Sequence, residues 1–282
     1  MQPILIRNLK RTFVIAPEWA DTPFGALRAA PEIFGPEPAR EAIGVERLGR
    51  HFRVRTALGG VLEGSMREVA CRLDSAIQRQ GLKAEAGALV VPAAILGQPG
   101  GGRIAFVGGR RTGKTWLSLL LIESGWRFEG DGWAIARSDG LVAAPRTIRV
   151  RDIPSNLSPE MRTHIESAPL LQEDVRENMR AVDPRRLAVD WTLRNGPVEA
   201  LFFLELNPGG RDSVRALTPD EAFGRALALC QGDMSALSAA LLRMAVTKPR
   251  AFRLRLGGPQ RSVEIVTQAL VPQRPSFDQG RI

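Results

Sequence analysis

The residues best suited to chemistry form one short stretch, residues 108–115, with the sequence GGRRTGKT. This stretch fits the pattern G-x-x-x-x-G-K-[ST] at every fixed position. Glycines let a backbone curl so that successive N–H groups point at phosphate oxygens, and a following helix adds partial positive charge at the same place. The stretch therefore predicts a loop that binds the phosphates of a nucleotide. The alternative is a tight strand-to-helix turn that merely contains a lysine.

Each residue of this loop has an expected role. We expect Lys114 to reach the β- and γ-phosphates and the hydroxyl of Thr115 to hold Mg²⁺. The predicted cofactors are therefore a nucleotide and Mg²⁺, with the choice between ATP and GTP left open by the motif, and replacing Lys114 with Ala is expected to abolish nucleotide-dependent activity. The remaining predicted nucleotide contacts are Gly108, Gly109, Arg110, Arg111, Thr112, Gly113 and Trp116.

The flanking segments predict the elements that must position the loop. The apolar run at residues 104–107 is typical of a buried strand, and residues 116–122 predict a helix that stops at Gly125. A strand, a glycine-rich loop and a helix in this order are the context in which the motif binds phosphate.

One acidic residue, Asp131, follows 17 residues after Lys114 and lies between two glycines. A carboxylate beside a bound nucleotide can hold Mg²⁺ or accept the proton of a hydroxyl group. Aspartates are also common in turns, and the spacing leaves both interpretations open. Glu205, near the end of a strand predicted over residues 200–206, is a weaker second candidate.

The composition limits the partners that we expect. The 282 residues are 44% hydrophobic, which is enough for a substantial core. The net charge of +9 comes almost entirely from arginines that are scattered along the chain, and the aromatic content of 6% includes no Tyr. Nucleic-acid binding is therefore not favoured, because there is no basic stripe with aromatic residues for stacking. No apolar run approaches the roughly 20 residues that span a bilayer, and we expect a cytoplasmic protein without a membrane span.

Three arginines, Arg146, Arg149 and Arg151, accompany a strand predicted over residues 147–151. They could neutralise a phosphate or an acidic acceptor. The more common outcome for such a strand face is that it is simply solvated.

The rest of the chain predicts an alternation of helices and strands. A capping box at residues 65–68 predicts a helix to about Gly81, and residues 87–96 predict an edge or bulged strand interrupted by Pro92. We expect a loop, with or without a short helix, over residues 16–44 and an exposed helix or mobile loop over residues 172–186. The other predicted elements are strands at 12–15 and 52–56, helices at 158–164, 218–230 and 235–246, and a closing hairpin from 251–256 and 262–266.

The combined pattern resembles the HPr kinase/phosphorylase family and its diverged relatives, which include serine kinases of lasso-peptide gene clusters. The resemblance rests on GGRRTGKT at 108–115, ESGWR at 123–127, FEGD at 128–131 and SDGLVAAPR at 138–146. It covers residues 87–151 well and extends more loosely to about residue 230.

The resemblance implies an α/β fold of the phosphoenolpyruvate-carboxykinase and HPr-kinase type, with mixed β-sheets around the P-loop helix. It implies a division into an N-terminal α+β segment, residues 1–86, packed on a catalytic domain, residues 87–282. The implied activity transfers the γ-phosphoryl group of ATP to a serine hydroxyl of a peptide, small protein or small molecule. Asp131 would be the general base, with Thr115 and Asp131 on the metal.

Three departures from the family pattern shape the alternatives. Residues 91–94 read VPAA where many relatives have L-H-A-A, Gly132 replaces a second aspartate, and Arg110 and Arg111 replace small residues. The first two departures argue against reverse phosphorylase activity and against the standard metal binding of the family. HPr itself is not favoured as the acceptor, because the chain lacks the arginine- and glycine-rich signature with which HPr kinases contact their partner. The alternative function is a catalytically degenerate nucleotide-binding regulatory or scaffold protein. The identity of the acceptor and the oligomeric state stay open, a homo-oligomer being one alternative.

Overall fold

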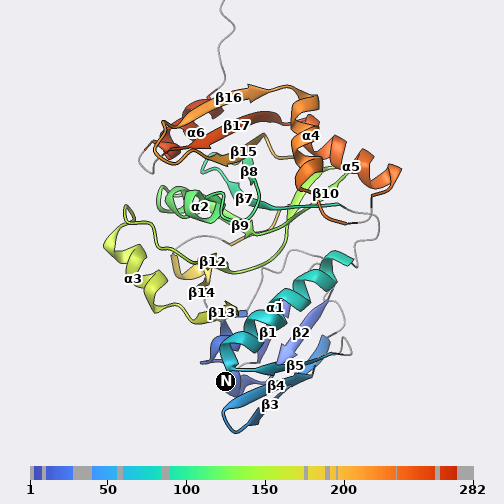
Figure 1. The fold of residues 1–282 in the computed structure, drawn as a ribbon, viewed down its shortest axis with the longest axis vertical. Coiled ribbons are helices and arrows are strands. Elements are labelled where there is room, and N and C mark those ends of the chain that lie inside the picture. Colours follow the sequence, from blue (N-terminus) through green and yellow to red (C-terminus); the bar gives the residue numbers. More distant parts are fainter. Residues whose placement is uncertain are drawn as a thin grey trace, which may run out of the picture.

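The chain has a mixed α/β fold, which confirms the predicted class. In the computed structural model, six α-helices and four β-sheets are formed by the described residues. Figure 1 shows the N-terminal elements at one end of the molecule and the largest sheet at the other. The described residues are 3–7, 11–27, 40–55, 60–83, 89–174, 177–187, 191–194, 196–232, 234–257 and 261–271.

The largest sheet has six strands, and the predicted nucleotide loop follows one of its central strands. In spatial order the strands are β16 (Ser213–Leu217), β17 (Arg250–Leu256), β15 (Ala200–Leu206), β8 (Arg103–Val107), β7 (Ala93–Gly97) and β9 (Arg127–Asp131). Strands β7 and β16 run opposite to the other four. The carboxyl ends of β8 and β9 therefore lie at the same edge of the sheet. Helix α2 (Lys114–Glu123) begins directly after the loop.

Strand β8 is buried on both sides because each face of the sheet has its own apolar core. Ile104 and Phe106 face the core that contains α2 and α6 (Ser262–Leu270). Ala105 and Val107 face the core that contains α4 (Pro219–Leu229) and α5 (Ala236–Thr247). A strand covered on both faces reads as a continuous apolar run, which is how the sequence shows it.

Pro92 divides the segment that was predicted as a single edge or bulged strand. Residues Val90–Val91 form β6, which pairs with β10 (Ala134–Arg137) in a three-stranded sheet completed by β11 (Gly140–Ala143). Residues 93–97 form β7, which is an interior strand of the large sheet. The prediction of one continuous strand was therefore wrong, whereas β6 is an edge strand of its sheet and the pairing of β7 with β9 has a bulge-like register shift between Ile95 and Leu96. Proline has no N–H to donate, so the chain changes sheets at this residue.

The N-terminal residues form a five-stranded sheet. Its strands in spatial order are β1 (Ile4–Arg7), β2 (Thr12–Ile15), β3 (Arg40–Leu48), β4 (His51–Arg55) and β5 (Val61–Gly64). Strand β3 includes residues 40–44, so the loop predicted over 16–44 was wrong at that end. Two short 3₁₀ helices, Pro17–Trp19 and Pro23–Leu27, occupy part of the remainder.

Helix α1 (Met66–Lys83) connects this sheet to the rest of the molecule. Its predicted capping box is confirmed, since Ser65 and Glu68 exchange hydrogen bonds of 2.8 and 3.4 Å. The helix packs on β4 and β5 on one side and on β13 (Leu170–Asp174) on the other. Strand β13 belongs to a sheet with β14 (Glu177–Val182) and β12 (Ile148–Val150), in the order β12-β14-β13.

One apolar core joins the N-terminal residues to this small sheet. Leu171, Met179 and Ala181 of β13 and β14 pack in the same core as residues of β1, β2 and α1. The boundary predicted between residues 86 and 87 lies outside the described residues, and the division into domains stays a prediction.

Two other predicted elements differ in the structure. The described part of residues 172–186, a segment predicted as an exposed helix or mobile loop, belongs to strands β13 and β14 and to a 3₁₀ helix at Pro184–Leu187. Residues 262–266, predicted as a strand, begin α6, whose Val266 packs in the core beside α2. In both cases burial against a distant element outweighed the local pattern. The helix predicted near residue 158 is confirmed as α3 (Pro159–Ser167).

Within the part of the chain that the structure describes, no helix is both long and apolar enough to cross a membrane.

Candidate functional site

Where the predicted nucleotide loop begins, directly after β8, its backbone lies close to the backbone at Pro92. The N–H of Gly108 donates to the carbonyl of Pro92 across 3.0 Å. A β-carbon at residue 108 would lie 2.6 Å from Oγ1 of Thr112, so only glycine fits here. The loop ends at Gly113, the N-cap of α2, whose φ of 91° is readily available only to glycine. These two glycines of the motif are thus required by the shape of the loop.

Arg111 adopts a backbone conformation that is unusual for a residue with a side chain. Its φ is 62°, and it is the one non-glycine residue with positive φ among those described. Such a conformation costs about 1 kcal/mol or more and is found preferentially at functional sites. The folded conformation of this loop therefore includes backbone strain at Arg111.

Lys114 folds back over the loop that precedes it. Its Nζ donates to the carbonyl of Gly108 across 2.8 Å and to that of Gly109 across 2.6 Å. Burial lowers the pKa of Lys114; the charge of Asp131 opposes this, and that of Arg151 adds to it. The ammonium group is thus held against the backbone carbonyls of the loop, and the charge of Asp131 acts on it.

The first turn of α2 has backbone N–H donors close to the ammonium group of Lys114. The first intrahelical hydrogen bond runs from the N–H of Leu117 to the carbonyl of Gly113, across 2.9 Å. The N–H groups of residues 114–116 therefore have no acceptor within the helix. Together with the helix dipole, they form an environment that favours an anion.

Asp131 lies beside this helix start. It is the last residue of β9, 5% exposed, and its Oδ2 accepts a hydrogen bond of 2.6 Å from the hydroxyl of Thr115. Asp131 pairs opposite Ala94 and lies directly before the bend at Gly132. The structure thus brings the predicted lysine, threonine and aspartate together at one edge of the sheet.

A cleft of about 930 Å³ opens over these residues. Its lining includes every predicted nucleotide-contact residue from 109 to 116 and also Asp131, whereas Gly108 lies outside the lining. The lining is strongly basic, with three acidic residues, Asp131, Asp152 and Glu177, against the cations Arg110, Arg111, Lys114, Arg146, Arg149 and Arg151. Such a cleft attracts polyanions.

The arginines that were expected on a solvated strand face are instead held inside the molecule. Arg146 and Arg149 each lie 2.9 Å from Oδ2 of Asp74, a residue of α1 that is 3% exposed. Asp74 was not predicted as a site residue. The one signal in the sequence is its spacing of four residues from Gln78, with both directly following apolar positions of the helix.

The third arginine belongs to a different cluster at the cleft. Glu177, at the start of β14, accepts contacts from Arg110 at 2.9 Å, from Arg151 at 3.4 Å, and from Arg111. Two of these arginines come from the predicted nucleotide loop. Glu177 therefore ties the loop to the opposite wall of the cleft.

The weaker candidate, Glu205, is not part of this site. Its carboxylate pairs with Arg225 of α4 at 2.6 Å and with Arg253 at 3.3 Å. It lies on the α4 face of the sheet, opposite the face that α2 covers, since it alternates with Leu204 of the α2 core.

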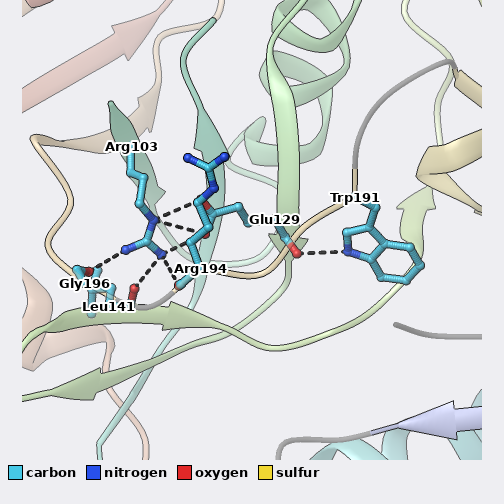
Figure 2. Close-up of polar contacts among 6 residues, drawn as sticks. All are labelled: Arg103, Glu129, Leu141, Trp191, Arg194 and Gly196. Carbon is cyan, nitrogen blue, oxygen red and sulfur yellow. Dashed lines mark hydrogen bonds and ion pairs between the residues drawn. The ribbon is translucent and has the colours of Figure 1, made fainter. Parts of the chain in front are cut away.

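A buried ion pair aligns the two strands that carry the site. Arg103 of β8 donates to both carboxylate oxygens of Glu129 of β9, with distances of 2.7 to 3.1 Å (Figure 2). Arg103 also donates to the carbonyls of Leu141, Arg194 and Gly196. The indole of Trp191 donates to the backbone carbonyl of Glu129 across 3.0 Å. All three guanidinium nitrogens of the arginine donate within the protein, so this cluster is structural and fixes Asp131 relative to the loop.

The hydroxyl group of Thr115 and the carboxylate of Asp131 suit a cation that takes its remaining ligands from phosphate and water. The described residues contain no group of three or more His, Cys, Asp or Glu side chains arranged to hold a metal ion. Mg²⁺ is usually bound by one or two protein oxygens together with phosphates and water. Thr115 and Asp131, hydrogen-bonded to each other at the helix start, fit that requirement.

No protein-family model matches the chain, and neither does any curated protein.

Proposed function

We propose that this protein is an ATP- and Mg²⁺-dependent kinase that transfers the γ-phosphoryl group to a hydroxyl group. The observation that carries the proposal is the hydrogen bond between Thr115 and Asp131, beside the lysine-bearing loop and within one basic cleft. A kinase needs a phosphate cradle and a carboxylate for the acceptor within reach of each other. The fold that we propose is the P-loop kinase type of the HPr-kinase-like proteins.

The loop and the start of α2 would hold ATP. Backbone N–H groups of residues 109–116 would face the phosphates, and Lys114 would exchange its bonds with the Gly108 and Gly109 carbonyls for bonds to phosphate oxygens. Thr115 and Asp131 would hold Mg²⁺, which supplies neutralisation of the phosphate charge.

Asp131 would receive the proton of the acceptor. Its Oδ2 already accepts a hydrogen bond from Thr115, which leaves Oδ1 for the hydroxyl group. The acceptor class is a serine hydroxyl on a peptide, a small protein or a small molecule, for which the open cleft offers room.

One observation favours a second candidate function, a nucleotide-binding regulatory or scaffold protein without transfer. Residue 132, directly after Asp131, is a glycine, so a single carboxylate would serve both the metal and the acceptor.

ATP turnover with serine peptides, together with ATP binding, separates the two candidates. The kinase predicts turnover that Asp131→Asn removes while ATP still binds, and that Lys114→Ala removes together with tight binding. A wild-type protein that binds ATP without turnover supports the scaffold, and a fully active Lys114→Ala protein rules out both.

A further inference from the structure

Helix α1 forms hydrogen bonds with Pro145 and Arg146, beside the cleft, through two buried polar side chains. Asp74 and Gln78 lie one helical turn apart and are 3% and 5% exposed. Nε of Arg146 donates to Oδ2 of Asp74 across 2.9 Å, and Nε2 of Gln78 donates to the carbonyl of Pro145 across 2.8 Å. The N-terminal helix therefore holds residues 145 and 146 at two adjacent points.

Asp74 faces two arginines, and they differ in what they present to the cleft. The side chain of Arg146 is 17% exposed, whereas that of Arg149 is 7% exposed and its guanidinium nitrogens are shielded from solvent. One carboxylate between two guanidinium groups leaves one positive charge uncompensated within the cluster. Because Arg146 is the more exposed member, it is the one that can offer this charge to a ligand.

Arg146 lies next to Asp131. Nη1 of Arg146 would be 3.3 Å from a β-carbon at Gly132, the residue after the aspartate. Burial lowers the pKa of Arg146, but the charges of Asp74 and then Asp131 outweigh it and leave the pKa above its ordinary value. Lys114 is influenced by the same carboxylate. Two cations from different elements thus lie around Asp131.

The other cleft arginines are held differently. Arg110 and Arg111 have side chains that are 57% and 65% exposed, and both pair with Glu177, as Arg151 does. Glu177 lines the cleft itself, so a nucleotide would compete with it. Asp74 is not among the cleft-lining residues, and it can keep Arg146 in place whether or not a ligand is bound. Such preorganisation is what makes a cation effective in stabilising a transition state.

We propose that Arg146 is a catalytic residue that contacts the γ-phosphoryl group, and that Asp74 and Gln78 are its positioning residues. This inference rests on the proposed kinase function. In the transfer, the acceptor oxygen forms a bond to the γ-phosphorus while the bond from that phosphorus to the β–γ bridging oxygen breaks. The bridging oxygen leaves with the electron pair as part of ADP, and the hydroxyl proton passes to Asp131. Arg146 donates hydrogen bonds to the non-bridging oxygens of the group in transit.

A matched pair of variants tests the role of Arg146. Arg146→Gln and Arg149→Gln each remove one guanidinium group from the same carboxylate, so the change in charge is equal. Dissociation constants for ATP and ADP are measured through the fluorescence of Trp116 and Trp133, which line the cleft. We expect Arg146→Gln to weaken ATP at least about tenfold, with ADP changed less than about twofold. We expect Arg149→Gln to keep the wild-type ratio of the two constants.

The double variant Asp74→Asn/Arg149→Gln tests positioning. It keeps the net charge of the cluster and frees Arg146 from its carboxylate. We expect loss of the ATP-over-ADP preference with ADP binding retained, whereas a merely structural role for Asp74 would weaken both nucleotides alike. If Arg146→Gln does not fold, this double variant still tests the proposal, because it keeps Arg146 and the net charge of the cluster.

Two outcomes overturn different parts of the account. If Arg146→Gln keeps the wild-type ratio of ATP to ADP affinity, the inference about Arg146 is wrong and the kinase proposal stands. If the wild-type protein shows no saturable binding of ATP, the proposed function is wrong and the role of Arg146 falls with it.

Discussion

The hydroxyl group of Thr115 donates a hydrogen bond of 2.6 Å to Oδ2 of Asp131. Thr115 lies in the first turn of α2 and Asp131 ends β9, and these two elements pack against each other. The bond therefore links the start of the loop helix to the strand that supplies the buried carboxylate. The first prediction tests this link directly.

Replacing Thr115 with Val keeps the shape of the side chain and removes the hydroxyl group. If Thr115 and Asp131 hold Mg²⁺, the variant should lose most of the gain in ATP affinity that Mg²⁺ provides, by about tenfold. Binding of ATP without the metal should change little. Titrations with and without Mg²⁺ measure both values. Thr163→Val, in the exposed part of α3, is the control, and equal Mg²⁺ dependence in both variants would contradict the metal role.

Replacing Glu177 with Gln should tighten ATP binding. Glu177 pairs with Arg110, Arg111 and Arg151, and these pairs must loosen before the arginines can contact phosphates. Partly exposed ion pairs contribute little individually, so we expect a gain of about twofold to tenfold. Equilibrium titration with ATP at fixed ionic strength measures the gain.

Asp152→Asn is the matched control for Glu177→Gln, because it makes the same change of charge in the same cleft. An equal gain in both variants would show that overall charge, and not the release of the arginines, controls the affinity.

Asp74 should make stability depend on pH in the acid range. Burial raises the pKa of Asp74, but the charges of Arg146 and Arg149 outweigh burial and hold it below its ordinary value of 3.8. A carboxyl group with a lowered pKa in the folded state stabilises the protein above its unfolded pKa, and this stability is lost as pH falls through the folded pKa.

A comparison of wild type with Asp74→Asn separates the contribution of Asp74 to the pH dependence of stability from the contributions of other carboxylates. At neutral pH the variant should be less stable by about 3–5 kcal/mol, because two buried arginines lose their counter-charge. The difference from wild type should shrink as pH falls below about 3.8. Denaturant unfolding at several pH values measures it, and a difference that stays constant into strong acid would refute the role of Asp74.

Replacing Glu129 with Gln should destabilise the fold strongly. The variant leaves the buried Arg103 without its counter-charge, and breaking such a pair costs about 3–5 kcal/mol. Glu63→Gln removes a comparable contact of 2.6 Å with Arg53 at the surface and should destabilise the fold much less, because solvent screens an exposed pair. The midpoints of urea unfolding compare the two. Similar losses would mean that the buried pair has no special part in aligning β8 and β9.

The sequence was most informative where the signal is local. The strand at 104–107, the glycine loop and the helix after it were all predictable, because apolar periodicity and a contiguous motif specify them within about 20 residues. The capping box at Ser65 was equally local and is confirmed, and the helix predicted from residue 218 is confirmed as α4, which also begins with a capping box. Predictions failed for residues 172–186 and 262–266, where the burial that decides the structure comes from α1 and α2.

The amino-acid sequence by itself determined the loop and singled out Lys114, Thr115 and Asp131, since residue type and spacing carry that information. Only the tertiary structure decided that Asp131 meets Thr115, that Glu205 faces the other side of the sheet, and that Asp74 holds Arg146. These pairings depend on strand order and on the packing of α1, which bring together residues separated by 16 to 72 positions. A local pattern contains no record of such contacts, because a charged side chain reads the same in sequence whether it is solvated or buried against a partner.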